Sequence, residues 1–80
     1  MVYVDDYRAP FRGMVMSHLV ADTEAELDAF ASRLGLKSRW KQRGGRRVHY
    51  DVSEGVRYKA VMLGAREVTC HDLARMTVGK

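Results

Sequence analysis

A chain of 80 residues has room for one small hydrophobic core, because a domain of this size buries only about 60% of its unfolded surface. A hydrophobic content of 46% with a single proline excludes the disordered and collagen-like classes. The single cysteine, Cys70, excludes an internal disulfide and a cysteine-based zinc cluster. No apolar run approaches the roughly 20 residues of a membrane span, so we expect one cytoplasmic domain with no membrane partner.

The net charge of +4 is unevenly distributed along the chain. Residues 1–36 carry three basic and six acidic side chains, net −3, and residues 48–80 carry five and four, net +1. Residues 37–47, the basic segment, carry six basic side chains and no acidic one: Lys37, Arg39, Lys41, Arg43, Arg46 and Arg47. Such a segment is either a solvated loop or a surface for nucleic acid or another anionic partner.

The first predicted element is a strand at residues 2–4, a β-branched and aromatic run that two aspartates follow. A second extended stretch falls within residues 14–20. Thr23 and Glu26 then form a capping box ahead of apolar residues at helical spacing, and a glycine follows the last of them. This pattern predicts an amphipathic helix over residues 24–34.

In the second half of the chain, the sequence VHYDV at residues 48–52 alternates apolar and polar side chains, which predicts a strand. A serine then caps a second helix over residues 54–63, which a glycine ends. The last elements are a short strand at residues 66–68, a helix of one or two turns after Thr69, and a loose tail at residues 77–80.

Strands that alternate with helices of about ten residues indicate βα units. We therefore predict a small single α/β domain over residues 1–80, with a short, mostly parallel sheet of three or four strands. Two main helices, a short C-terminal helix and the basic loop at residues 37–47 complete it. In such sheets ligands bind at the carboxyl ends of the strands, so we expect Asp5, Asp6 and Asp51 to meet at one edge.

Carboxylates at this edge form a candidate metal site. Asp5, Asp6 and Asp51 are the predicted ligands, because carboxylate oxygens together with an imidazole suit Mg²⁺, Mn²⁺ or Zn²⁺ in phosphoester chemistry. The candidate catalytic residues are His49, Asp51 and Asp5. The structural alternative is that the aspartates end strands or cap helices while His49 and Asp51 face solvent, and the residues alone leave both interpretations open.

Side chains of several types at the same edge are candidates for ligand binding: Asp6, His18, Trp40, His49, Asp51 and Arg57. His49 and Asp51 project on the same side of a strand, so they can act on one target or orient each other. Arg57, near the start of the following helix, can present its guanidinium fork to a phosphate. The alternative for Arg57 is an ion pair with Asp51 or Glu54.

A set of short motifs follows in order along nearly the whole chain: VYVDD, Arg12-Gly13, His18-Leu19, Ala21-Asp22, Glu26-Leu27, Phe30-Ala31, Leu34-Gly35-Leu36, Trp40 with Gln42, His49-Tyr50-Asp51, Arg57 and Gly64-Ala65. Together they resemble the uncharacterised family catalogued as domain of unknown function 4031, small proteins of actinobacteria and their phages. The resemblance implies a phage origin and no particular activity. The chain departs from the family's pattern at residues 14–16, where an aromatic residue is typical, and at Asp28, where a histidine is typical.

The predicted function is the binding of a small phosphorylated or nucleotide-like ligand by an Asp/His/Arg edge, with Trp40 and the basic segment forming one wall. One alternative is a metal-dependent phosphoesterase or nuclease that uses a divalent ion. Another is an accessory protein that binds nucleic acid through the basic segment or binds a host factor. A small sheet leaves an edge or a face open for pairing, which is compatible with a homodimer.

Overall fold

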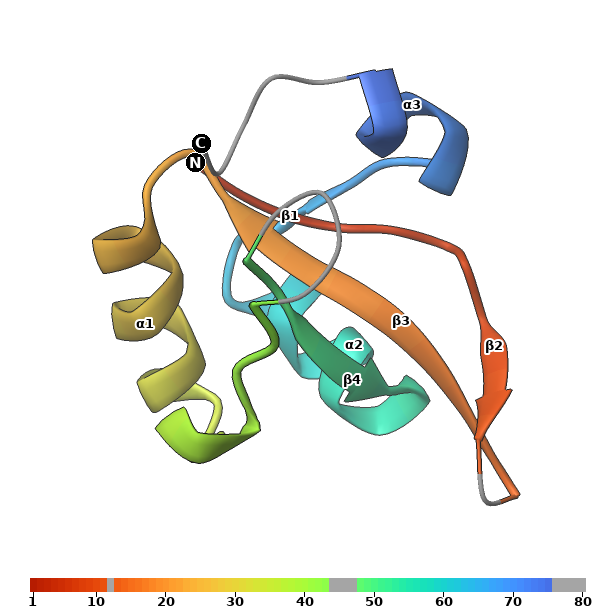
Figure 1. Cartoon of the computed structure of the whole chain (residues 1–80), viewed down its shortest axis with the longest axis horizontal. Coiled ribbons are helices and arrows are strands. Elements are labelled where there is room, and N and C mark those ends of the chain that lie inside the picture. The colour runs from red at the N-terminus through yellow and green to blue at the C-terminus, as the bar shows by residue number, and fades with distance from the viewer. Residues whose placement is uncertain (12, 44–47, 76–80) are drawn as a thin grey trace.

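The computed structural model of the chain describes residues 1–11, 13–43 and 48–75. One mixed sheet is combined with two main helices and a short C-terminal helix, so the predicted α/β class is confirmed (Figure 1). The strands are β1 (Val2–Val4), β2 (Ala9–Phe11), β3 (Met14–Ala21), β4 (Tyr50–Ser53) and β5 (Arg66–Glu67). The helices are α1 (Glu24–Arg33), the short 3₁₀ helix η1 (Ser38–Trp40), α2 (Glu54–Met62) and α3 (Cys70–Arg75).

The long strand β3 organises the sheet. It pairs antiparallel with β1 through its last residues, with β2 through its first residues, and with β4 in between. Only the pairing of β1 with β5 is parallel among the strand pairs of the described residues. The expectation of a mostly parallel sheet was therefore wrong, because β2 turns back into β3 as a hairpin and the long connection through α1 and η1 returns β4 antiparallel to β3.

The helix boundaries follow from local signals that the sequence carries. The Thr23 hydroxyl accepts a hydrogen bond from the Glu26 backbone N–H at 3.1 Å, and Ser53 starts α2 in the same way through the Val56 N–H. Gly35 and Gly64 follow the two helices with φ of 81° and 109°, a left-handed conformation that glycine adopts without steric cost. The helices predicted at residues 24–34 and 54–63 lie where expected.

The hydrophobic core lies between one face of the sheet and the helices α1 and α2. Leu19 of β3, Val4 of β1 and Tyr50 of β4 are opposite one another in the sheet and all are buried. Leu27 and Ala60 complete the cluster from α1 and α2. Because side chains alternate along a strand, the neighbours of these core residues project from the other face of the sheet, and that face carries the candidate site.

Some predicted features lie outside the described residues, namely Arg46, Arg47 and the tail at residues 77–80. Within the described ranges, none of the helices has both the length and the apolar character needed to cross a membrane.

Candidate metal site

Three polar residues form a row across three strands on the sheet face opposite α1 and α2. His18 of β3 is the register partner of Asp51 in β4, and on the β1 side the Asp5 backbone N–H donates to the His18 carbonyl at 3.0 Å. Directly opposed residues in antiparallel strands project on the same side. His49, two residues before Asp51, projects on that side too, and its backbone pairs with Gln42 through two hydrogen bonds.

Asp5 and His18 form the buried part of this row. The Asp5 carboxylate is fully buried, and its Oδ2 lies 2.7 Å from His18 Nδ1. Its Oδ1 accepts hydrogen bonds from the backbone N–H of His18 at 2.8 Å and of Tyr7 at 3.2 Å. Asp5 therefore holds both the imidazole and the chain that leads from β1 toward β2.

The surroundings shift both pKa values in the direction of an ion pair. Burial alone would raise the pKa of Asp5, but the hydrogen bonds from His18 and Tyr7 outweigh it and hold that pKa below its usual value. The hydrogen bond to Asp5 raises the pKa of His18, although burial opposes this shift. Asp5 is thus an anion that accepts a hydrogen bond from the protonated Nδ1 of His18. This contact directs Nε2 of His18 away from Asp5.

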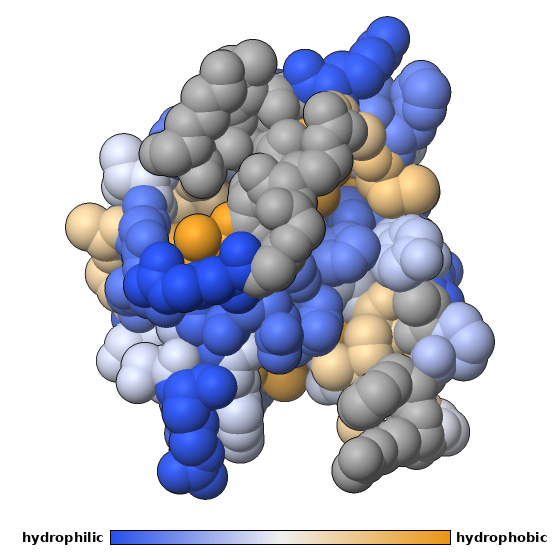
Figure 2. Space-filling view, viewed as in Figure 1, coloured by the Kyte–Doolittle hydropathy of each residue, from blue (hydrophilic) through white to orange (hydrophobic). Residues whose placement is uncertain are grey.

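The outer part of the site is formed by His18, His49 and Asp51. The two imidazoles meet edge to face with ring centroids 5.1 Å apart, and His49 Nε2 lies 3.4 Å from Asp51 Oδ1. One ligand atom from each of the three side chains lies within 4.8 Å of the other two. All three residues are at least partly accessible to solvent, and much of the coloured surface in the view of Figure 2 is hydrophilic.

Two imidazoles and one carboxylate are a ligand set suited to a divalent transition-metal ion. The contact of His18 Nδ1 with Asp5 matches the carboxylate–histidine–metal arrangement, in which a second carboxylate fixes the tautomer and orientation of the ligating ring. An ion bound by three side chains also keeps coordination positions for water or another ligand. The group can therefore hold an ion and still leave it accessible.

The three aspartates predicted as metal ligands are not gathered around one point. Asp5 uses both oxygens inside the protein, and Asp6 accepts a hydrogen bond from the Cys70 backbone N–H at 2.8 Å, at the start of α3. Only Asp51 lies in the group that can share an ion among the described residues. Asp5 thus orients the His18 ring, while Asp6 holds α3 against the end of β1.

Arg57 is engaged in structural contacts. Its Nε donates to the Asp5 carbonyl oxygen at 2.8 Å, its Nη1 lies 3.2 Å from Glu67, and its side chain is only 11% exposed. The two carboxylates that the sequence suggested as partners lie elsewhere, since Asp51 pairs with His49, and Glu54 with Arg8 at 3.6 Å. Arg57 therefore links α2 to the end of β1 and to β5, directly behind the site.

Because of these contacts, Arg57→Lys is expected to lower the free energy of unfolding by about 1.5–3 kcal/mol, the range for a hydrogen bond to a charged group. Lysine lacks the fork that reaches Asp5 and Glu67 together. Thermal melting and phosphate titration of the same variant separate this structural role of Arg57 from the predicted binding of an anionic ligand. A melting temperature equal to that of the wild type, combined with weaker ligand binding, would indicate that Arg57 binds the ligand instead.

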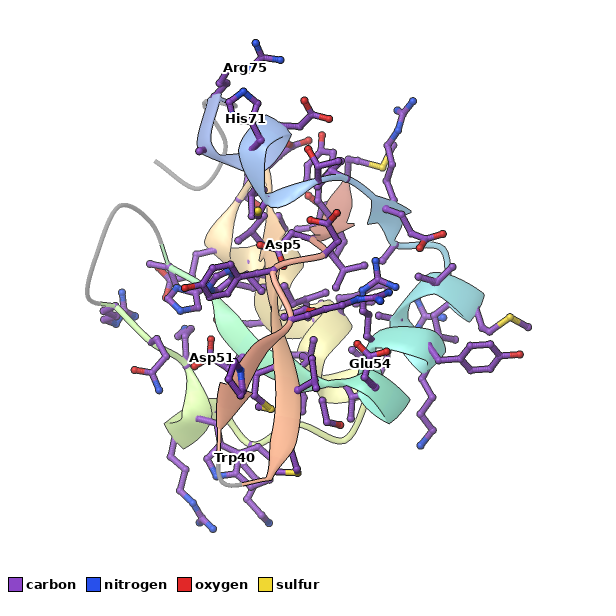
Figure 3. The ribbon with its side chains drawn as sticks, turned by 90° about the vertical axis from the view of Figure 1, so that its right-hand side faces the viewer. Asp5, Trp40, Asp51, Glu54, His71 and Arg75 are labelled. Carbon is purple, nitrogen blue, oxygen red and sulfur yellow. The ribbon has the colours of Figure 1, made fainter. Side chains whose placement is uncertain are left out.

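The basic segment is partly neutralised by α1. Lys41 is nearly buried and lies 2.6 Å from Glu24 and 3.0 Å from Asp28, and Arg43 contacts Glu24 at 2.5 Å. Lys37 and Arg39 are exposed. Trp40 is half exposed in η1, and Figure 3 shows it apart from Asp5, on the far side of Asp51. Two of the basic side chains thus fasten the segment to the helix.

Tyr7 is part of the site although the sequence did not point to it. Its ring stacks on His18 with centroids 4.9 Å apart and an interplanar angle of 24°. The residue lies between two short strands, where neither periodicity nor a motif marks it. Only the register that places Asp5 beside His18 could have revealed this contact.

The family model described as "Protein of unknown function (DUF4031)" matches residues 2–80, nearly the whole chain. The chain belongs to this family. No curated protein and no solved structure matches it. Membership in DUF4031 confirms the resemblance seen in the sequence motifs, and the family description names no activity.

Proposed function

We propose that the domain binds a divalent transition-metal ion through His18 Nε2, His49 and Asp51, and that this ion binds the phosphate of a small phosphorylated ligand. The observation that carries the proposal is the close grouping of three ligand atoms, within 4.8 Å of one another, on two neighbouring strands. The buried Asp5 supports it, because it fixes the His18 ring with Nε2 turned outward.

Charge explains why a phosphorylated ligand needs the ion. Asp5 and Asp51 bring two negative charges to the site. Phosphate is itself an anion, so these side chains alone would repel it. A divalent ion reverses the sign of the site and offers open coordination positions to phosphate oxygens. The ion and the phosphorylated ligand are therefore parts of one proposal.

The ligand set also indicates the class of ion. Imidazole nitrogens suit Zn²⁺, Co²⁺, Ni²⁺ and Fe²⁺, whereas Mg²⁺ and Ca²⁺ prefer oxygen ligands throughout. We expect Co²⁺ and Zn²⁺ to bind more tightly than Mg²⁺. An ion with open positions can also activate water, so metal-dependent phosphoester hydrolysis is the second candidate, and release of inorganic phosphate from the ligand would identify it.

Calorimetric titration with Co²⁺ tests the proposal. Wild-type protein is expected to bind one ion, and Asp51→Asn is expected to weaken binding by at least about 10–100-fold, the loss seen when only an orienting partner is removed. His71→Gln is the matched control, because His71 is an exposed histidine on α3, on the opposite side of Asp5 from Asp51 in Figure 3.

Inorganic phosphate, titrated next, is expected to bind only to the Co²⁺-loaded protein. Equal heats for wild type and Asp51→Asn would contradict the metal site. Phosphate binding that is the same with and without the ion would contradict the role of the ion in holding the ligand.

A further inference from the structure

The Tyr7 ring packs one face on His18, and the residue is still more than half exposed to solvent. It packs on the His18 imidazole in an offset-stacked arrangement, with centroids 4.9 Å apart. The residue is nevertheless 54% exposed. Since the inner face is covered by His18, most of this exposed surface belongs to the opposite face and the ring edge.

The backbone holds this aromatic ring in place. The Tyr7 N–H donates to Asp5 Oδ1 at 3.2 Å, and Asp5 also binds His18 through both of its oxygens. The next residue, Arg8, has φ of 54°, the left-handed conformation that non-glycine residues rarely adopt. Strained positions of this kind cluster at functional sites, where they fix a side chain in a required place. One carboxylate thus positions both the imidazole and the tyrosine.

The Tyr7 ring lies beside the proposed ion position, because it stacks on the imidazole that would bind the ion. A ligand bound to His18 Nε2 lies close to the plane of the imidazole, and the Tyr7 ring is inclined to that plane by only 24°. A flat group stacked on the outer face of Tyr7 would lie parallel to the Tyr7 ring, with that ring between the group and the His18 imidazole. In a nucleotide the sugar joins the flat base to the phosphate, so a single ligand would occupy both the outer face of Tyr7 and the ion.

We propose that Tyr7 is the stacking platform for the base of a nucleotide whose phosphate is bound by the ion at His18, His49 and Asp51. This inference rests on the proposed function and narrows its ligand from any phosphorylated small molecule to a nucleotide. Every base has a π-face, so a single tyrosine gives affinity for nucleotides without strong selection among bases. Stacking on an aromatic side chain contributes about 1–3 kcal/mol per base.

The test compares two probes on the Co²⁺-loaded protein, adenosine 5′-monophosphate and ribose 5-phosphate, which differ only by the base. Calorimetry of the wild type is expected to give about 5- to 150-fold tighter binding of the nucleotide, the factor that corresponds to one stacked base. Tyr7→Ala is expected to remove this preference, which is measured as the ratio of the two affinities on the same variant. Tyr7→Phe should retain the preference, because the ring alone is required.

The matched control is Tyr58→Ala, which removes another exposed tyrosine, on α2, and should leave the preference intact. Equal affinities of the two probes for the wild type, or an undiminished preference in Tyr7→Ala, would overturn the stacking role while leaving the ion site standing. Failure of both probes to bind the Co²⁺-loaded wild type would overturn the proposed function together with this inference.

Discussion

Asp5→Asn is expected to lower the metal affinity by about 100-fold, the upper end for loss of an orienting partner, while the domain stays folded. The asparagine oxygen can still accept the backbone hydrogen bonds of His18 and Tyr7 that Asp5 Oδ1 accepts now. The amide NH₂ then faces His18 Nδ1, which has to become an acceptor. The ring proton moves to Nε2, and the nitrogen that should bind the ion loses its lone pair, as in other sites where an aspartate fixes the tautomer of a histidine.

Asp6→Asn is the matched control for this variant. Asp6 is the adjacent carboxylate, and an asparagine at that position can still accept the Cys70 N–H. Co²⁺ titration measures the metal affinity of both variants, and circular dichroism shows whether each variant is folded. The expected result is a folded Asp5→Asn protein with weak metal binding beside an Asp6→Asn protein that binds like the wild type. Weak metal binding by both variants would instead favour the carboxylate site of Asp5, Asp6 and Asp51 that the sequence suggested.

The stability of the metal-free protein is expected to peak in mildly acidic solution. The folded pKa of Asp5 is lowered, so its contribution is complete above the unfolded value of about 3.9 and is lost as the pH falls. The folded pKa of His18 is raised, so its contribution is complete below about pH 6.5 and is lost as the pH rises through the folded pKa. Both contributions are therefore complete between about pH 4 and 6.5.

Urea unfolding in the presence of a chelator, repeated across the pH range, measures this profile. In the plateau, Asp5→Asn is expected to be less stable than the wild type by about 1.5–3 kcal/mol, the range for a hydrogen bond between charged groups. Its stability should also fall less steeply than that of the wild type above pH about 6.5. Two results would contradict this coupling of Asp5 and His18. One is a wild-type stability that rises steadily from pH 6 to 8, and the other is a stability of Asp5→Asn that falls above pH about 6.5 as steeply as that of the wild type.

The helices could be predicted because their signals are local. Thr23 and Ser53 cap the two main helices, and a glycine follows each, all within the reach of one or two turns. The sheet could not be predicted in the same way. The strand directions in the sheet depend on the hairpin between β2 and β3. Two sequence features conceal this hairpin: it has no Asn-Gly or Asp-Gly turn, and β2 contains a proline, which is unusual in a strand.

The candidate site was predicted in its residue types more than in its geometry. The sequence put His49 and Asp51 on one face of a strand and named His18 as a further candidate, and the β3–β4 register places His18 directly opposite Asp51. The sequence could not show that Asp5 is buried, because the burial of a carboxylate depends on how the strands pair across the sheet. The contact of Arg57 with the backbone carbonyl of Asp5 likewise leaves no trace in the sequence.

The most direct test of the metal site is X-ray absorption spectroscopy of the protein loaded with one equivalent of Zn²⁺, in the His71→Gln background to remove the exposed histidine of α3. The expected spectrum contains two imidazole nitrogens and a carboxylate oxygen at about 2.0–2.2 Å from the metal. The imidazole signal should fall to one ring in His49→Gln. A first shell made of oxygen alone, or one that His49→Gln leaves unchanged, would contradict a site formed by His18, His49 and Asp51.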